Sequence, residues 1–380
     1  MKDRVWEEIS ISNLKHNVEI IKSLAPQKTL FLLMKDNAYG HGAIEITKAL
    51  QSDKDIAGYA VASIDEALNL RKANITKNII IISHTYKKRF EEVVNNNIIQ
   101  TVSTFDEAKE LSDIATKKEL NARIEIALDT GMGRIGFLID DESNIQYALS
   151  EIKKINNLPN LSIHGFFSHF SVADEDFEHN ILDKNYTDMQ EELFNNFLEK
   201  IQNEEIKYKY SSISNSAGIL NKYGKNASTI RPGIILYGIS PSEYLDKFDF
   251  KPIMQMKARV MYIKEVEAQK SISYGRTYIT KEKMKIATVS VGYGDGYPRT
   301  ASNKAYVIIN NKKCNIIGRV TMDMIMVDIT NVDVKLYDEV ILIGSSEDES
   351  ISLKELCNIT GDFTYEILTR VNHRVEKIYI

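Results

Sequence analysis

The sequence predicts an α/β protein that has an N-terminal (β/α)8 barrel of the TIM type and a mainly β C-terminal domain. The chain has 380 residues, more than one hydrophobic core usually holds, so two domains are expected. Its first two thirds alternate short apolar, β-branched runs with stretches whose apolar residues recur at helical spacing. Its last third consists mainly of strand-like runs. We expect the domains to cover residues 1–245 and 246–380.

The barrel prediction depends on the number and order of the apolar runs. Strands that alternate with helices form right-handed βαβ units and a parallel sheet. Eight such units in about 240 residues fit a (β/α)8 barrel, although an open doubly wound sheet has the same periodicity. The expected strands are Thr29–Lys35, Gly58–Ser63, Asn78–Ser83, Ile98–Ser103, Arg123–Leu128, Ser162–His169, Tyr208–Ser214 and Ile230–Gly238.

The pattern changes after Tyr237. The loop SPSEYLDKFDFKP is followed by five strand-like segments, and Asn310-Asn311 lies between two apolar runs as in a hairpin turn. A mainly β domain is therefore expected. The five segments are MQMKARVMYIKEV, KMKIATVSVGYG, AYVIINNKKCNIIGRV, MIMVDI and DEVILIG.

Composition excludes several classes of function. A formal net charge of -5 argues against a nucleic-acid surface, which needs a clustered basic excess. The sequence has no apolar run of membrane-spanning length, and MKDRVWEEIS is too charged for a signal peptide, so a cytoplasmic location is expected. Cys314 and Cys357 are the only cysteines, which leaves no disulfide framework and no CxxC metal site. We expect no metal.

Polar residues recur where the expected barrel strands end. Lys35 ends the first strand, Arg134 follows the fifth, and His169 ends the sixth. Asn215-Ser216 follows the seventh strand, and Arg231-Pro232-Gly233 opens the eighth. The carboxyl ends of barrel strands meet at one mouth, where barrel enzymes place their active sites. This distribution predicts a catalytic site there.

The same positions suggest a cofactor. The loops after strands seven and eight of a barrel often bind phosphate, and here they offer the Ser216 hydroxyl and the backbone of Gly233. A lysine opposite such a cradle can capture an aldehyde. Together these features suggest pyridoxal 5'-phosphate, covalently attached at Lys35.

The segment MKDNAYGHG, residues 34–42, resembles the cofactor-attachment segment of alanine racemases. Further family motifs follow in the family's order over essentially the whole chain: DTGMGRIGF, SHFSVAD, NSAG, RPGIILYG, SYGRTY, VGYGDGYPR, GRVTMDM and TYE. The resemblance implies a barrel and a β domain in a head-to-tail homodimer whose active sites are shared between chains. It also implies interconversion of L- and D-alanine, supplying D-alanine for peptidoglycan.

The resemblance assigns a role to each matching residue. Lys35 looks like the Schiff-base lysine and one catalytic base, and Tyr274 resembles the opposite base, donated by the partner chain. The cofactor-binding positions implied are Lys35, Tyr39, His169, Asn215, Ser216, Arg231, Gly233, Ile234 and Tyr365. The substrate-binding positions implied are Arg134, Met322 and Asp323.

The chemistry explains why these residue types are needed. Racemisation removes a proton from one face of the α-carbon and returns one to the other, so two bases on opposite sides are the simplest arrangement. A phenol serves as a base only if its pKa of about 10 falls; a drop of about 2–3 units needs roughly 3–4 kcal/mol. A positive field from His169 and Arg231 is expected to supply it. An arginine facing the cofactor's ring nitrogen keeps its own proton, which makes the ring a weaker electron sink and limits side reactions.

One departure from the family leaves the substrate range open. Many members carry a carbamylated lysine seven residues before the arginine of DTGMGR, and this chain has Ala127 there. Arg134 must then be held by a bound anion, by water or by another side chain. A broad-specificity racemase acting on serine, lysine or arginine is therefore the alternative. A related decarboxylase is disfavoured because its expected cysteine and acidic specificity residue are missing from the matching region.

Overall fold

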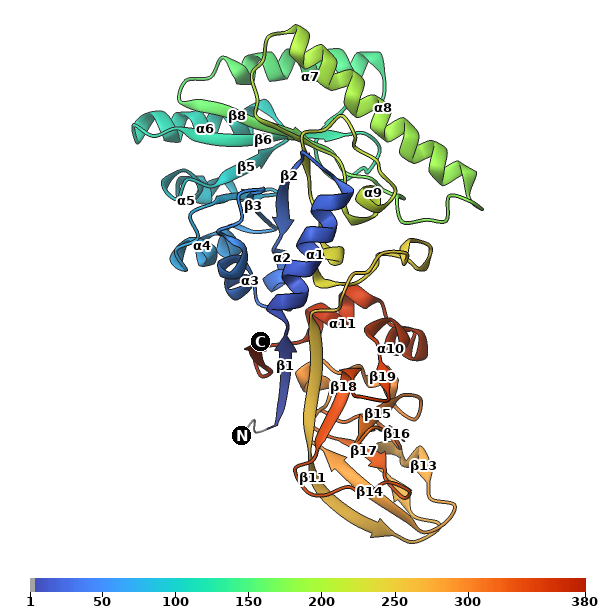
Figure 1. Ribbon diagram of the computed structural model, residues 1–380. Helices are drawn as coiled ribbons and strands as arrows, with labels where there is room; N and C mark the ends of the chain where they lie inside the picture. Colours follow the sequence, from blue (N-terminus) through green and yellow to red (C-terminus); the bar gives the residue numbers. More distant parts are fainter. Residues whose placement is uncertain (1–3) are drawn as a thin grey trace. The chain divides into compact units, whose positions relative to one another are not determined.

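The computed structural model describes residues 4–380 (Figure 1). The described chain forms two compact units. The barrel unit contains residues 13–38 and 43–251, and the C-terminal unit contains 4–12, 39–42 and 252–380. The division into residues 1–245 and 246–380 stays a prediction.

The barrel unit contains a sheet of eight parallel strands in the order β10-β2-β3-β4-β5-β6-β8-β9. Its two end strands are joined by reciprocal hydrogen bonds: Ser211 N donates to Ser228 Oγ (2.9 Å), and Ser228 N donates to Ser211 Oγ (3.0 Å). The predicted barrel is therefore confirmed, in a nearly closed form. Its strands are β2 (Thr29–Leu33), β3 (Ile56–Val61), β4 (Asn78–Ile81), β5 (Ile99–Val102), β6 (Ala122–Asp129), β8 (Leu161–Phe167), β9 (Tyr210–Ser212) and β10 (Thr229–Ile230). A short strand, β7 (Phe137–Leu138), pairs with β6.

Helices lie on the outside of these strands (Figure 1). Side-chain caps fix where several of them begin, since the first backbone N–H groups of a helix need acceptors. Ser63 and Glu66 form a capping box at one helix, and Thr104 and Asp141 cap two others. The helices are α1 (Ile11–Leu24), α3 (Ala43–Leu50), α4 (Ile64–Lys72), α5 (Phe90–Asn95), α6 (Phe105–Lys117), α7 (Glu142–Asn156), α8 (Ile181–Asn203) and α9 (Ser216–Leu220), with the 3-10 helices η1 (Lys87–Arg89), η2 (Ile234–Tyr237) and η3 (Glu243–Leu245).

Seven of the eight barrel strands end earlier than the sequence predicts, and three of these early ends affect the site. β2 stops at Leu33 and β8 at Phe167, so Lys35 and His169 lie just beyond their strands. The expected strand Ile230–Gly238 is wrong beyond Ile230, where the chain turns and then forms η2. Pro232 explains the early end, because it has no N–H to donate to a sheet, although its carbonyl still accepts from Leu33 N at 3.1 Å.

The side chains that fill the barrel establish which strand face points inward. Phe31, Ile80, Ile99 and Tyr210 form one buried cluster, yet they come from β2, β4, β5 and β9. Phe31 and Tyr210 meet edge to face, with ring centroids 5.1 Å apart. Strands that are not all neighbours can meet in this way only inside the barrel. Because successive side chains alternate, Thr101 on β5 shares the inward face with Ile99.

The C-terminal unit is mainly β, as predicted. Its main sheet has the strand order β16-β15-β18-β11-β1-β20, and β14, β17 and β19 join its members. A separate two-stranded sheet pairs β12 with β13. The strands are β1 (Val5–Ile9), β11 (Met254–Val266), β12 (Ser271–Ile272), β13 (Tyr278–Ile279), β14 (Met284–Val289), β15 (Tyr306–Ile309), β16 (Lys312–Asn315), β17 (Ile325–Asp328), β18 (Glu339–Ser345), β19 (Ser350–Ile351) and β20 (Glu376–Tyr379). The helices are α10 (Leu353–Thr360), α11 (Thr364–Arg370), η4 (Tyr274–Arg276), η5 (Tyr293–Asp295) and η6 (Arg299–Ala301).

The hairpin expected at Asn310-Asn311 is present between β15 and β16. Both asparagines have positive φ, 50° and 60°, as a two-residue type I′ turn requires. No helix within residues 4–380 combines the length and the apolar character needed to cross a membrane.

Candidate active site

Lys35 begins an unusual turn at the end of β2. The element α2 (Lys35–Tyr39) contains four consecutive left-handed residues, Asp36, Asn37, Ala38 and Tyr39, with φ of 50°, 54°, 57° and 52°. For residues with a side chain this conformation costs about 1–2 kcal/mol each. Backbone strain of this kind is usually kept at functional sites.

Three hydrogen bonds hold the turn within the barrel unit. Ala38 N donates to Met34 O at 2.9 Å. Asp36 N donates to Glu66 Oε1 at 2.6 Å, and Ala43 N donates to Asn37 Oδ1 at 2.9 Å. Asp and Asn tolerate the left-handed region better than most residues do. Asp36 and Asn37 are therefore residue types that suit the turn that positions Lys35.

Gly40 and Gly42 complete the segment and belong to the C-terminal unit. Both have positive φ, 88° and 95°. A Cβ added at Gly40 would press against the carbonyl of Leu368, and one at Gly42 against the Tyr379 hydroxyl. Only glycine fits both the conformation and the space.

We therefore expect Gly40→Ala to destabilise the protein and to lower cofactor content. The substitution adds the cost of positive φ to that of a clash with backbone, together about 2–4 kcal/mol. Gly361→Ala is the matched control: Gly361 has φ of 76°, and nothing lies within 4 Å of the added Cβ. Thermal unfolding of both variants measures the difference, and equal losses of stability would contradict the packing argument.

Arg231 lies at the carboxyl end of β10 and is only 6% exposed. Its Nη2 donates to the Ser168 carbonyl, and its guanidinium lies 4.4 Å from the centroid of the Phe167 ring. Its Nη1 is buried without a hydrogen-bond partner among the described residues. An unmatched buried donor costs about 1–3 kcal/mol, which points to an acceptor supplied by a ligand.

The charges at the barrel mouth act on one another. Burial, followed by the positive charges of Arg231, Arg134 and Lys35, lowers the pKa of His169 to about 3. His169 is therefore neutral at physiological pH. Burial likewise lowers the pKa of Arg231 to about 10, partly offset by Glu125. The charges of Lys35, Arg134 and Arg231 thus act on His169, which indicates that these four predicted residues lie in one part of the barrel unit.

Ser216 and Gly233, which are expected to cradle an anion, lie next to each other. Gly233 N donates to Ser216 Oγ at 2.9 Å. Asn215 caps α9 by accepting from Gly218 N at 2.9 Å, so it shapes the loop that presents Ser216. Ile234 follows Gly233 as the first residue of η2.

Arg134 is exposed and lies on a constrained loop after β6. Asp129 Oδ1 accepts from the backbone N–H groups of Gly131 and Gly133, at 2.9 and 3.0 Å. Thr130 Oγ1 lies 2.8 Å from Ser168 Oγ, which links the loop to the strand end near Arg231. Ala127 is buried in β6.

Tyr39 and Tyr365, also assigned to the cofactor, lie in the C-terminal unit. Their ring centroids are 5.9 Å apart, and Tyr365 stacks on Phe363 at 4.9 Å. The structure therefore brings these two predicted residues together.

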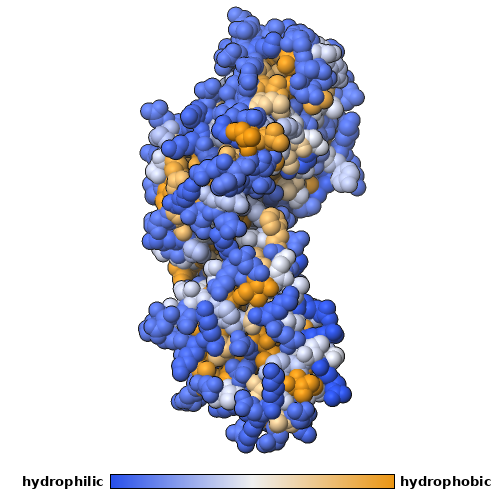
Figure 2. All heavy atoms as spheres, turned by 90° about the vertical axis from the view of Figure 1, so that its right-hand side faces the viewer, coloured by the Kyte–Doolittle hydropathy of each residue, from blue (hydrophilic) through white to orange (hydrophobic). Residues whose placement is uncertain are grey.

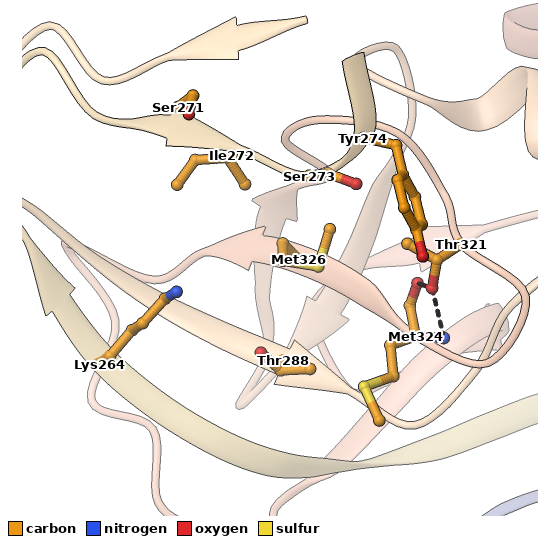
Figure 3. A pocket seen from close by; sticks show the side chains of 9 residues that line it. All are labelled: Lys264, Ser271, Ile272, Ser273, Tyr274, Thr288, Thr321, Met324 and Met326. Carbon is orange, nitrogen blue, oxygen red and sulfur yellow. Dashed lines mark hydrogen bonds between the residues drawn. The ribbon is translucent and has the colours of Figure 1, made fainter. Parts of the chain in front are cut away.

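Tyr274 lines an open pocket of about 460 Å³ in the C-terminal unit (Figure 3). It is the first residue of η4 and is 69% exposed. The preceding Ser273 has φ of 64° and donates from Oγ to Arg319 O at 2.6 Å, which fixes the turn that presents the ring. The other lining residues are Lys264, Ser271, Ile272, Ser273, Thr288, Thr321, Met324 and Met326.

Met322 and Asp323 lie in the loop before β17. Met322 is 52% exposed, and Arg374 Nη2 donates to Asp323 Oδ1 at 2.6 Å.

Figure 2 shows one face of the molecule, with separate apolar patches on a mostly hydrophilic surface. The C-terminal unit exposes seven large apolar or aromatic side chains on the strands and loops around this region: Met261, Tyr262, Tyr274, Ile279, Tyr293, Met322 and Met324.

One residue beside the site was missed by the sequence reasoning. Glu125 on β6 is buried, and its charge acts on Arg231. The signal was present, because Glu125 is the one charged residue within the buried run IEIAL. A charged residue is almost never buried without a partner or a function.

Known families account for nearly the whole chain. Residues 9–241 match the family model of the alanine racemase N-terminal domain, and residues 253–379 match that of the C-terminal domain. The chain belongs to the alanine racemase family. The predicted family and fold class are therefore confirmed.

Individual alanine racemases match this chain over nearly their whole length. The alanine racemase of Clostridium kluyveri is 41% identical over 379 residues, which cover 99% of this chain and 94% of that protein. The solved alanine racemase of Clostridium difficile 630 is 34% identical with a TM-score of 0.91, covering 100% of this chain and 96% of that one. The Bartonella henselae alanine racemase, solved with covalently bound pyridoxal phosphate, is 28% identical with a TM-score of 0.84 and full coverage of both chains.

Membership of the alanine racemase family makes the chain an enzyme of the isomerase class, in a family that depends on pyridoxal phosphate. The relatives favour alanine racemase over the broad-specificity alternative. The roles of individual site residues stay predictions.

Proposed function

We propose that the protein interconverts L- and D-alanine with pyridoxal 5'-phosphate held at the mouth of its barrel. The observation that carries the proposal is the buried Nη1 of Arg231, which has no hydrogen-bond partner among the described residues and lies in the part of the barrel unit where Lys35 and Arg231 act on His169. A primary amine beside a buried guanidinium suits an aldehyde-bearing aromatic cofactor.

The barrel residues fit this cofactor. The unpartnered Nη1 of Arg231 would face the ring nitrogen, and the Ser216–Gly233 cradle would bind the phosphate together with the backbone of Ile234. Tyr39 and Tyr365 are proposed to add hydroxyl contacts to the phosphate. Lys35 would form the covalent attachment. When bound, the cofactor withdraws electrons from the substrate's α-carbon and makes its hydrogen acidic.

The chain's residues then move the proton. Lys35 is proposed to serve one face of the α-carbon, and Tyr274 of a second copy the other. His169 is neutral, so the positive potential at the site comes from Arg231 and Arg134 rather than from the imidazole. Arg134 and Met322, beside Asp323, are proposed to hold the substrate carboxylate.

The assembly proposed is a homodimer with shared sites. Tyr274 and Met322 are each more than half exposed in the single chain, whereas a base acting on carbon needs an enclosed site. A second copy that covers this surface would exclude water and complete the site. We place the reaction in the cytoplasm, where D-alanine would supply peptidoglycan synthesis.

The purified protein tests the proposal directly. We expect an absorbance band of bound pyridoxal phosphate, and conversion of L- and D-alanine to the same equilibrium, because enantiomers have equal free energies. L-serine, L-lysine and L-arginine should be racemised much more slowly. Activity on lysine well above that on alanine would overturn the substrate assignment, and absence of the absorbance band would overturn the cofactor assignment.

A further inference from the structure

Glu125 is a buried carboxylate inside the barrel. Thr101 and Glu125 are register partners between β5 and β6, and Glu125 and Gly165 are partners between β6 and β8. Since Thr101 shares the inward face with Ile99, Glu125 and Gly165 point inward as well. Glu125 is 3% exposed.

Gly165 gives this carboxylate its space. A Cβ at position 165 would lie 3.1 Å from Glu125 Oε1 and would press against the Tyr210 carbonyl. Two residues further along β8, Phe167 lies on the same inward face and supports the Arg231 guanidinium on its ring. Glu125 and Arg231 therefore border two residues, Gly165 and Phe167, that are two positions apart on the inward face of β8.

Three polar atoms inside the barrel or at its mouth are buried without a hydrogen-bond partner among the described residues: Thr101 Oγ1, Glu125 Oε2 and Arg231 Nη1. Buried charges are normally paired. Glu125 and Arg231 carry opposite charges, and each acts on the other. No hydrogen bond or ion pair joins the two among the contacts of the described residues, so each charge compensates the other in part, across a distance.

We propose that Glu125 is the internal counterion of Arg231 and a positioning residue for the reaction. By balancing the guanidinium, it sets the positive potential that Arg231 presents to the cofactor's ring nitrogen. The cofactor part of this inference rests on the proposed function, whereas the pairing of the two charges does not.

A contribution to the stability of the fold does not explain why a glutamate is buried at position 125. Burial raises the pKa of Glu125 to about 7, and Arg231 offsets only part of that rise. The folded-state pKa therefore lies above the unfolded value near 4.3, so the fold loses stability as pH rises from about 4.5 to about 7. A side chain that costs stability beside an active site is expected to be kept for function.

Tyr210 on β9, the register partner of Gly165, is a phenol on the same inward face. The other charged or titratable groups near the pair lie on β6, on β8 and at the barrel mouth. Arg123, two residues earlier on β6, bonds to Asn78 Oδ1 at 2.8 Å and to the Asn97 carbonyl at 2.6 Å. Burial lowers the pKa of His164 on β8 to about 4, so it is uncharged above that pH. Thr101 and Gly165 do not titrate, and the groups toward the mouth are Arg134, His169 and Lys35.

The pairing is tested on the apoprotein by infrared titration. We expect a protonated carboxyl C=O band that disappears near pH 7 and is missing in Glu125→Gln. In Arg231→Gln the loss of the cation should move this titration upward by about one unit. A titration unchanged by Arg231→Gln would overturn the pairing.

The functional part is tested on the holoenzyme. In Glu125→Gln the uncompensated guanidinium disfavours protonation nearby, so the pH midpoint of the bound cofactor's absorbance should fall by about one unit. Turnover of alanine should fall about tenfold with little change in KM. Glu125→Asp keeps the charge and should restore the midpoint. Glu7→Gln, which removes another buried carboxylate, paired with Lys377 in the C-terminal unit, should leave it unchanged.

A purely structural Glu125 predicts a different result. Glu125→Gln would then lower the thermal stability at pH 8, whereas we expect the variant to be at least as stable as the parent there. An unshifted cofactor midpoint would overturn the positioning role. A parent protein that binds no cofactor would refute the proposed function, and the infrared titration would still decide whether Glu125 and Arg231 are paired.

Discussion

Replacement of Lys35 by alanine is expected to abolish racemisation and the covalent attachment of the cofactor. The amine is proposed both to hold the cofactor and to serve one face of the α-carbon, so its loss should lower kcat by at least about four orders of magnitude. Absorbance of the dialysed protein and turnover of both alanine enantiomers measure the two losses.

Lys35→Arg separates charge from bond formation. Arginine retains the cation that contributes to the low pKa of His169, but it does not form the attachment. We expect Lys35→Arg to be as inactive as Lys35→Ala, and added methylamine to restore part of the activity of the alanine variant. Lys109→Ala removes an exposed lysine paired with Asp113 and should behave as the parent. A cofactor that stayed covalently attached in Lys35→Ala would remove Lys35 from its proposed role.

The fold class could be predicted from local pattern, and its closure could not. Alternation of apolar runs and helical spacing gives the parallel strands, but closure also needs β10 to pair with β2, which joins Thr229 to Thr29 at a separation of 200 residues. The pairing of β1 with β11 and β20 is equally non-local. Nothing in VWEEI specifies those partners.

Strand ends were the least predictable feature. The expected strand Ile230–Gly238 contains a continuous apolar run, IILY, that instead forms η2. Pro232 and Gly233 indicate in the sequence that the strand ends early, because a proline interrupts hydrogen bonding within a sheet. The left-handed residues 36–39 could not be foreseen, since Ala38 and Tyr39 adopt that conformation only under tertiary constraint.

Sequence motifs named most of the candidate site residues, whereas a residue that is recognised by its burial was missed. Lys35, Arg231 and Ser216 lie just beyond strands whose presence, though not whose exact ends, periodicity predicts. Glu125 lies inside a strand. Its proposed role depends on Gly165 on the neighbouring strand and on the charge of Arg231, and only the folded barrel brings these residues near it. The neutral state of His169 is likewise a product of burial and three neighbouring cations.

Tyr274→Phe is expected to lower kcat for both enantiomers by roughly two to four orders of magnitude while leaving the cofactor bound, because only the phenolic proton carrier is removed. The ratio of kcat/KM in the two directions must stay at unity, since L- and D-alanine have equal free energies. Tyr147→Phe changes a tyrosine on α7 that is 60% exposed, and it should have no effect.

Hydrogen exchange distinguishes a base from a structural residue. In deuterated water, Tyr274→Phe should still exchange the α-hydrogen of the one enantiomer whose hydrogen faces Lys35, without racemising it. The other enantiomer should not exchange. A structural defect would instead slow exchange of both enantiomers alike, and that outcome would exclude Tyr274 as the second base.

Mixing two inactive variants tests whether Tyr274 acts across copies. In a dimer of one Lys35→Ala chain and one Tyr274→Phe chain, one site combines the intact lysine of one copy with the intact tyrosine of the other. Random re-association of equal amounts makes half of the dimers mixed, so about a quarter of the parent activity should return. Pairing Lys35→Ala with a chain that carries both substitutions should return none. If Lys35 and Tyr274 of the same chain formed each site, both mixtures would stay inactive, and the exposure of Tyr274 would need a different explanation from a covering second copy.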